Sequence, residues 1–149
     1  MRTRLRRLHV DGQAFTWRAG IHHAPGSGDC HRCIRVRAWV DDKTRQALQA
    51  DLLSLTWPAP WGACTTDGAY PTLADVRAVI LYGLAHGWQP ERRGGTFTLT
   101  ERDHAAHFTL PGFLLTDRLH TPDSDDPTTR VINAHERRRY HQTDLTEPE

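Results

Sequence analysis

Residues 71–88 read PTLADVRAVILYGLAHGW, a stretch in which a helix start signal, a helical period and a stop signal agree. Thr72 is placed to cap the N-terminus, and Asp75, three residues later, can close a capping box. Gly87 is placed as the left-handed residue after the last turn, and the proline three residues further on prevents the helix from continuing. The stretch predicts one helix over residues 73–86.

One face of this predicted helix is apolar. At about 100° per residue, the positions that share the face are Leu73, Val76, Ile80 and Leu84, with Val79 and Gly83 on its flank. Such a face must be buried, so we expect the helix to pack on another layer of the fold. We also expect Gly83 to leave room for the indole of Trp88, which can fold back over the last turn.

The N-terminal part of the chain carries a hairpin signal. Asp11-Gly12 separates two strand-like runs and favours a type I′ turn. In the register set by this turn, four apolar side chains share one face, namely Leu8, Val10, Phe15 and Trp17. The same register pairs Arg6 with Trp17, so we expect the guanidinium to lie over the indole ring.

A strand with one apolar and one polar face is predicted over residues 34–40. Ile34, Val36, Ala38 and Val40 alternate with Arg35, Arg37 and Trp39, so the wet face carries two cations and an aromatic ring. The Gly-rich residues 20–29 before it are expected to form a mobile loop. Residues 44–56 after it have apolar spacings that fit either a helix or a strand.

A long connection, residues 57–70, precedes the main helix and holds two prolines and the aromatic residues Trp57, Trp61 and Tyr70. Loops of this length within a compact domain are often functional. We therefore expect these three side chains either to form a binding surface or to cover the core beneath the loop.

The fold class indicated by these patterns is α+β. We expect an antiparallel sheet of about four to six strands, with the main helix (residues 73–86) packed on one face. Alternation predicts later strands over residues 96–100, 107–110 and 113–119. Residues 1–119 are expected to form one compact domain, and the polar residues 120–149 a flexible tail.

Composition narrows the class of protein. A chain of 149 residues suits a single domain, and a net charge of +1 with 25% charged residues favours no polyanion over the whole surface. Because no apolar run approaches a membrane span or follows the basic N-terminus, we expect a cytoplasmic protein that does not bind membranes. The three cysteines are expected to be reduced thiols.

A zinc site is one alternative that the cysteine spacing raises. Two thiolates at Cys30 and Cys33 have the C-x-x-C spacing that can hold one ion, and Cys64 with His23 could complete a tetrahedron. A zinc ribbon would carry a second such pair, which this sequence lacks. The alternative interpretation is two ordinary thiols beside a strand.

Enzymatic signals are weak. His104 and His107 lie close to Glu101 and Asp103, but they do not form a metalloprotease motif, and flanking strand patterns place them in a connection. No serine or cysteine stands on a strand-to-helix elbow. The sequence thus favours a protein without catalytic residues.

The remaining signals concern binding. Arg, Trp and Tyr are enriched at protein interfaces, so the leading hypothesis is a non-enzymatic binding or adaptor protein whose partner is another protein. Its expected contact residues are Arg35, Arg37, Trp39, Trp57, Trp61 and Tyr70. Basic and aromatic side chains on one strand are also typical of single-stranded nucleic-acid binders, which remain an alternative beside the zinc module.

Overall fold

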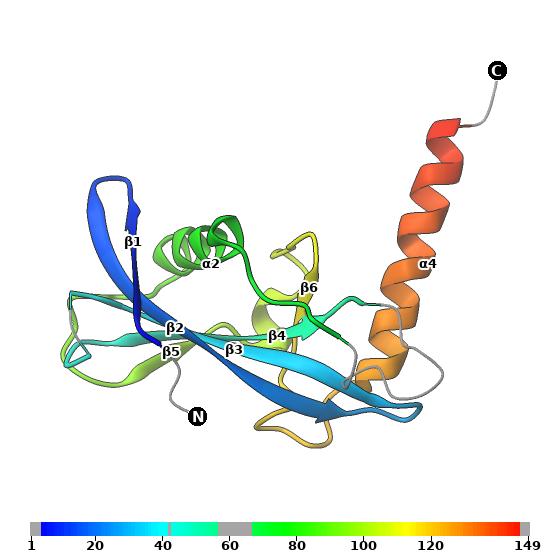
Figure 1. The fold of residues 1–149 in the computed structure, drawn as a ribbon, viewed down its shortest axis with the longest axis horizontal. Coiled ribbons are helices and arrows are strands. Elements are labelled where there is room, and N and C mark those ends of the chain that lie inside the picture. Colours follow the sequence, from blue (N-terminus) through cyan, green and yellow to red (C-terminus); the bar gives the residue numbers. More distant parts are fainter. Residues whose placement is uncertain (1–3, 42, 57–66, 147–149) are drawn as a thin grey trace.

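A mixed sheet of six strands forms the centre of the fold (Figure 1). The computed structural model describes residues 4–41, 43–56 and 67–146, with side chains as far as residue 139. The strands are β1 (Arg6–Val10), β2 (Gln13–Pro25), β3 (Cys30–Val40), β4 (Ala47–Ser54), β5 (Thr96–Thr98) and β6 (Phe113–Leu115). The helices of the described residues are α2 (Leu73–Ala85), α3 (Glu101–His104) and α4 (Pro127–Thr146).

The sheet has the order β1-β2-β3-β4-β5, and β6 pairs with β4 beyond the end of β5. The α+β class is confirmed, but the sheet is not purely antiparallel, because β5 runs parallel to β4. After β4 the chain crosses one face of the sheet in α2 and returns in the same direction, as parallel neighbours require. The expectation of one main helix also needs correction, because α3 and α4 join α2.

The N-terminal hairpin forms in the predicted register. Val10 pairs with Gln13 and Arg6 with Trp17. Asp11 and Gly12 have φ angles of 50° and 82°, the positive values that a type I′ turn requires. The guanidinium carbon of Arg6 lies 5.7 Å from the centre of the Trp17 ring, which confirms the expected stacking.

The expected mobile loop at residues 20–29 is wrong. Strands β2 and β3 continue through most of it, and the connection is a tight turn in which the Gly26 amide donates to the Asp29 carbonyl over 2.8 Å. Gly26 instead allows the turn to pack closely against α4, because a Cβ at this position would clash with the Thr128 hydroxyl.

Residues 44–56, which fit two structures by sequence, contain strand β4. Its side chains are buried on both faces of the sheet: Leu52 belongs to the core beneath α2, and Leu53 belongs to a second cluster on the opposite face. Pairing with β3 on one side and with β5 and β6 on the other outweighs the helical propensity of this stretch.

Two other local predictions need correction. Residues 107–110 are not a strand, and β6 alone represents the predicted pair. Glu101–His104 is a short helix, with the Thr100 hydroxyl accepting a hydrogen bond from the Asp103 amide as its N-cap. A local cap therefore outweighs the strand patterns that flank it.

Both ends of α2 form as predicted. The Thr72 hydroxyl accepts from the Asp75 amide at 3.1 Å, and the Asp75 carboxylate accepts from the Thr72 amide at 2.9 Å. The helix ends at Ala85, and Gly87 takes a φ of 114°. The Trp88 amide then donates to the Gly83 carbonyl over 2.9 Å, which closes the last turn.

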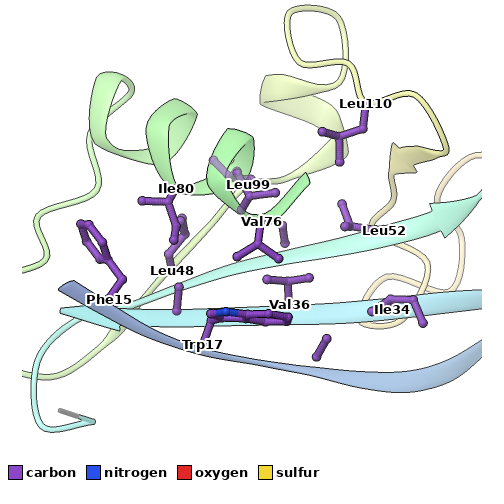
Figure 2. Close-up of a cluster of buried hydrophobic side chains, with 14 of the residues drawn as sticks. Phe15, Trp17, Ile34, Val36, Leu48, Leu52, Val76, Ile80, Leu99 and Leu110 are labelled. Carbon is purple, nitrogen blue, oxygen red and sulfur yellow. The ribbon is translucent and has the colours of Figure 1, made fainter. Parts of the chain in front are cut away.

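The buried face of α2 is narrower than expected. Val76, Val79, Ile80 and Gly83 are buried, whereas Leu73 and Leu84 are 57% and 39% exposed. Gly83 makes room for Leu48 rather than for Trp88, since a Cβ there would lie 2.9 Å from both Leu48 methyl carbons. Figure 2 shows this layer, in which Val76 and Ile80 point down onto the sheet above Trp17 and Val36.

Helix α4 lies in the stretch for which a flexible tail is predicted. Its residue Val131 is fully buried against Ala24, Cys33 and Leu53, on the face of the sheet opposite α2. The later turns of α4 extend away from the sheet (Figure 1). The proposed boundary at residue 119 stays a prediction, but the packed layer includes Val131.

A set of hydrogen bonds attaches the start of α4 to the β2–β3 turn. The Asp126 carboxylate accepts from the Ser27 amide at 2.8 Å and from the Ser27 hydroxyl at 2.5 Å. It also accepts from the amide and hydroxyl of Thr129, so it caps the helix. Burial raises the pKa of Asp126, but these four hydrogen bonds together outweigh it and hold the pKa well below its usual range.

This attachment predicts a pH dependence. Because the pKa of Asp126 is lower in the folded than in the unfolded state, its contribution is fully present above the unfolded pKa of about 4 and is lost as the pH falls through the folded value. We expect Asp126→Ala to cost about 1 kcal/mol at pH 7, the usual cost of losing an N-cap. Hydrogen exchange of the α4 amides at pH 7 and at pH 3 measures the difference between wild type and variant, which should shrink at the lower pH. A difference that does not change with pH would contradict the assignment.

Candidate functional site

Four cations and one tryptophan gather on the sheet face opposite α2. We call this set the Arg/Trp face; it consists of Arg18 from β2, Arg35, Arg37 and Trp39 from β3, and Lys43 just after β3. Arg18 pairs directly with Arg37 across the two strands. The regular alternation of β3 carries Arg35, Arg37 and Trp39 to one face, as the sequence predicts.

Trp39 is the anchor of this face. Three cationic groups lie over its ring: Arg37 at 5.3 Å, Arg18 at 5.6 Å and Lys43 at 5.6 Å from the ring centre. Their stems cover the indole, which is only 3% exposed. The ring quadrupole offsets part of the repulsion between these like charges.

Two arginines of this cluster, Arg18 and Arg37, lack an acidic partner among the described residues. No carboxylate of the described residues lies within 4.0 Å of the Arg18 or Arg37 guanidinium nitrogens. Arg37 donates to the Thr96 hydroxyl over 3.1 Å, while its buried Nε has no hydrogen-bond partner in the described part of the chain. Burial, followed by the charges of Arg18 and Arg35, lowers the pKa of Arg37.

Arg35 differs from its neighbours, because it is neutralised. Its guanidinium makes a bidentate pair with Asp51, with distances of 2.8 and 3.1 Å, and the Asp51 side chain is 1% exposed. The hydrogen bond to Asp51 raises the pKa of Arg35. Since His120 lies 3.6 Å from the same carboxylate, this group is a structural pair within the sheet face.

The Arg/Trp face is hollowed in two places. An open pocket of about 360 Å³ is lined by Arg18, Arg37, Trp39, Lys43, Arg45, Gly94, Gly95 and Thr96. A smaller hollow of about 190 Å³ lies beside it, with Arg18, Gly20, His22, Arg35 and Arg37 around it. Arg18 and Arg37 therefore line both hollows. Their guanidinium groups are of the kind that binds carboxylate or phosphate groups.

Of the three aromatic residues predicted in the loop before α2, the structure describes Tyr70. Trp57, Trp61 and Cys64 lie outside the described residues. Tyr70 is 37% exposed, and its hydroxyl donates to the Ala19 carbonyl over 3.4 Å. Arg32 donates hydrogen bonds to the carbonyls of Asp67 and Ala69, just before Tyr70. By the alternation of β3, Arg32 lies on the same face of the sheet as Ile34 and Val36, which is the face that α2 covers. Tyr70 and the Arg/Trp face thus lie on opposite sides.

The proposed zinc ligands that the structure describes do not share one face of the sheet. Strand β3 places Cys30 and Cys33 on opposite faces, because residues three apart on a regular strand point in opposite directions. Cys33 is fully buried, and burial raises the pKa of its thiol. His23 pairs with Arg32, on the face away from Cys33. Among the described residues, no group of three His, Cys, Asp or Glu side chains could hold a metal ion.

The histidine cluster near α3 makes other contacts. The His104 Nδ1 lies 3.0 Å from the Tyr82 hydroxyl, and Tyr82 stacks on His86 at 3.8 Å between ring centres. Glu101 accepts from the Asp117 amide at 3.1 Å and pairs with Arg130 at 3.3 Å. His104 and Glu101 therefore have partners that anchor α3.

Sequence reasoning missed Arg18 and Lys43 as members of the site. Arg18 could have been found from the predicted hairpin, because an inward Trp17 implies an outward Arg18. Its pairing with Arg37, however, depends on how far β2 extends into the supposed loop. Lys43 joins the site only through the turn after β3.

Comparison of the chain with protein-family models, with curated proteins and with solved structures finds no match. Within the described residues, no helix combines the length and apolar character needed to cross a membrane. The function must therefore be inferred from the site itself.

Proposed function

We propose that this chain is a non-enzymatic binding domain whose Arg/Trp face recognises an acidic segment of a partner protein. The observation that carries the proposal is the cluster of Arg18, Arg37 and Lys43 over Trp39, in which no acid of the described residues neutralises either arginine. Like charges directly opposite on neighbouring strands are destabilising. Bringing them together is useful when a ligand supplies the opposite charge.

The geometry favours carboxylate side chains. A guanidinium binds a carboxylate through two parallel hydrogen bonds, and neither Arg18 nor Arg37 has a carboxylate partner within the described residues. The two adjoining hollows share Arg18 and Arg37, so successive acidic side chains of an extended peptide could enter them in turn. The acidic side chains would then offset the repulsion between Arg18 and Arg37.

A single-stranded nucleic acid fits this face less well. Such ligands gain affinity when bases stack on exposed aromatic rings. Trp39 is 3% exposed, and cations cover its ring, so no base can stack there. A strand of phosphates could meet the charges but would lose the stacking contribution.

The test is fluorescence anisotropy with a labelled Asp/Glu-rich decapeptide, repeated at several salt concentrations. We expect Arg37→Gln and Arg18→Gln each to weaken binding about tenfold, because a hydrogen bond to a charged group contributes about 1.5–3 kcal/mol. The affinity of wild type should fall as salt rises. Both variants should remain folded, since each relieves repulsion.

Two controls make the result specific. Arg102→Gln removes the same charge from an exposed position on α3 and should leave peptide affinity unchanged. A labelled oligothymidine of similar net charge tests the alternative. Equal losses in all three variants, or tighter binding of the oligothymidine than of the peptide, would overturn the proposal.

A further inference from the structure

A further cavity, apart from the two hollows of the Arg/Trp face, lies where β6 and α4 meet. It has a volume of about 440 Å³, within the range typical of small-molecule sites. Its walls come from the segment after α3, from β6 and from α4. The apolar lining includes Ala105, Phe108, Leu110, Phe113, Leu115 and Ala134.

Helix α4 adds three arginines to this apolar lining. Arg130, Ala134, Arg137 and Arg138 recur at the spacing of one helix face, so the helix presents a small apolar contact and three cations to the cavity. No acidic side chain lines the cavity within the described residues. An apolar interior with a cationic wall is complementary to an amphiphile that has an anionic head.

Arg130 is the most buried of the three arginines. Its side chain is 16% exposed, and burial lowers its pKa against the opposing influence of the nearby carboxylates. Its Nη1 lies 3.3 Å from the Glu101 carboxylate but makes no hydrogen bond to a described residue. The charge of Arg130 is therefore balanced by Glu101, so any binding of an anion depends on the other two arginines.

The other two arginines, Arg137 and Arg138, donate hydrogen bonds to neutral backbone carbonyls. Arg138 donates to the Pro111 carbonyl over 2.6 Å, and Arg137 donates to the Asn133 carbonyl of its own helix over 3.4 Å. Both acceptors are neutral. The positive charge of each group can thus act on a ligand head at the cavity mouth.

We propose that this cavity binds a small anionic amphiphile, with its apolar chain among Leu110, Phe113 and Leu115 and its head against Arg137 and Arg138 of α4. The site is separate from the Arg/Trp face, so the inference does not depend on the proposed function. A carboxylate and a phosphate head share the required chemistry.

Isothermal titration calorimetry with decanoate, decyl phosphate and decanol tests the proposal. We expect decanoate or decyl phosphate to bind at least about tenfold more tightly than the neutral decanol. The tighter of the two anions identifies the preferred head. Methyl resonances of Ala134 and Leu110 should shift during the same titration, which places the ligand in the cavity.

Matched variants separate charge from shape. The double variant Arg137→Gln/Arg138→Gln should lose about tenfold in affinity for the anions while its affinity for decanol stays unchanged, whereas Arg139→Gln, outside the cavity lining, should have no effect. Ala105→Leu fills the cavity from the opposite wall and should weaken all three probes. Equal affinity for decanol and the anions, or unshifted methyl resonances at saturating decanoate, would overturn the proposal.

Discussion

Trp17→Ala is expected to lower the free energy of unfolding by about 3–5 kcal/mol, the usual cost of removing a large aromatic side chain from a core. Trp17 is 1% exposed and lies beneath the Val76 and Ile80 layer of α2 (Figure 2). The hairpin and the main helix therefore lose a shared contact. Urea denaturation followed by far-ultraviolet circular dichroism measures the change.

Trp17→Phe is the informative control for this prediction. The Trp17 Nε1 is buried and has no hydrogen-bond partner within the described residues. Phenylalanine keeps most of the apolar volume and removes this unsatisfied donor, whose burial is itself costly. We expect less than half the loss caused by alanine. An equal loss would mean that the indole nitrogen is bonded in solution.

The parts of the fold that the sequence predicts are those fixed by local chemistry. A type I′ turn needs positive φ at Asp11 and Gly12, and these angles determine the register of β1 and β2. The capping box of Thr72 and the left-handed Gly87 likewise depend only on near neighbours. Such signals can be recognised without knowing the rest of the structure.

The missed parts depend on contacts between distant segments. Residues 47–54 become a strand because β3, β5 and β6 offer edges on both sides, which helix propensity cannot anticipate. The exposed Leu73 shows the same limitation, since the helical period defines a wide face and packing selects part of it.

The candidate site combines both kinds of information. Alternation on one strand is sufficient to place Arg37 beside Trp39 on a polar face. The addition of Arg18 and Lys43, and the neutralisation of Arg35 by the buried Asp51, depend on neighbouring elements. The sequence therefore predicts the surface, and the structure shows which of its charges lack an acidic partner among the described residues.

Val131→Asp is expected to separate α4 from the sheet while the core beneath α2 stays folded. Val131 is fully buried and packs on Ala24, Cys33 and Leu53. A charged group buried there costs several kcal/mol, so release of the helix is the less costly outcome. The principal core lies on the other face of the sheet and does not include Val131.

The buried thiol of Cys33 reports this release. In a Cys30→Ser/Cys64→Ser background, Cys33 is the remaining cysteine of the chain. Its burial and raised pKa should make its reaction with Ellman's reagent slow in the parent protein. The Val131→Asp variant should react at least about a hundredfold faster, because a docking free energy of about 3 kcal/mol corresponds to that change in open population.

Asn133→Asp is the matched control, because it introduces the same charge at an exposed position of α4. We expect it to leave the Cys33 reaction rate within about twofold of the parent. Hydrogen exchange in the Val131→Asp variant should show lost protection in α4 and retained protection in α2 and β3. Loss of protection throughout the sheet would instead show that α4 is required for the whole fold. Selective loss would establish that the sheet and α2 form one cooperative unit, on which α4 docks as a second and less stable one.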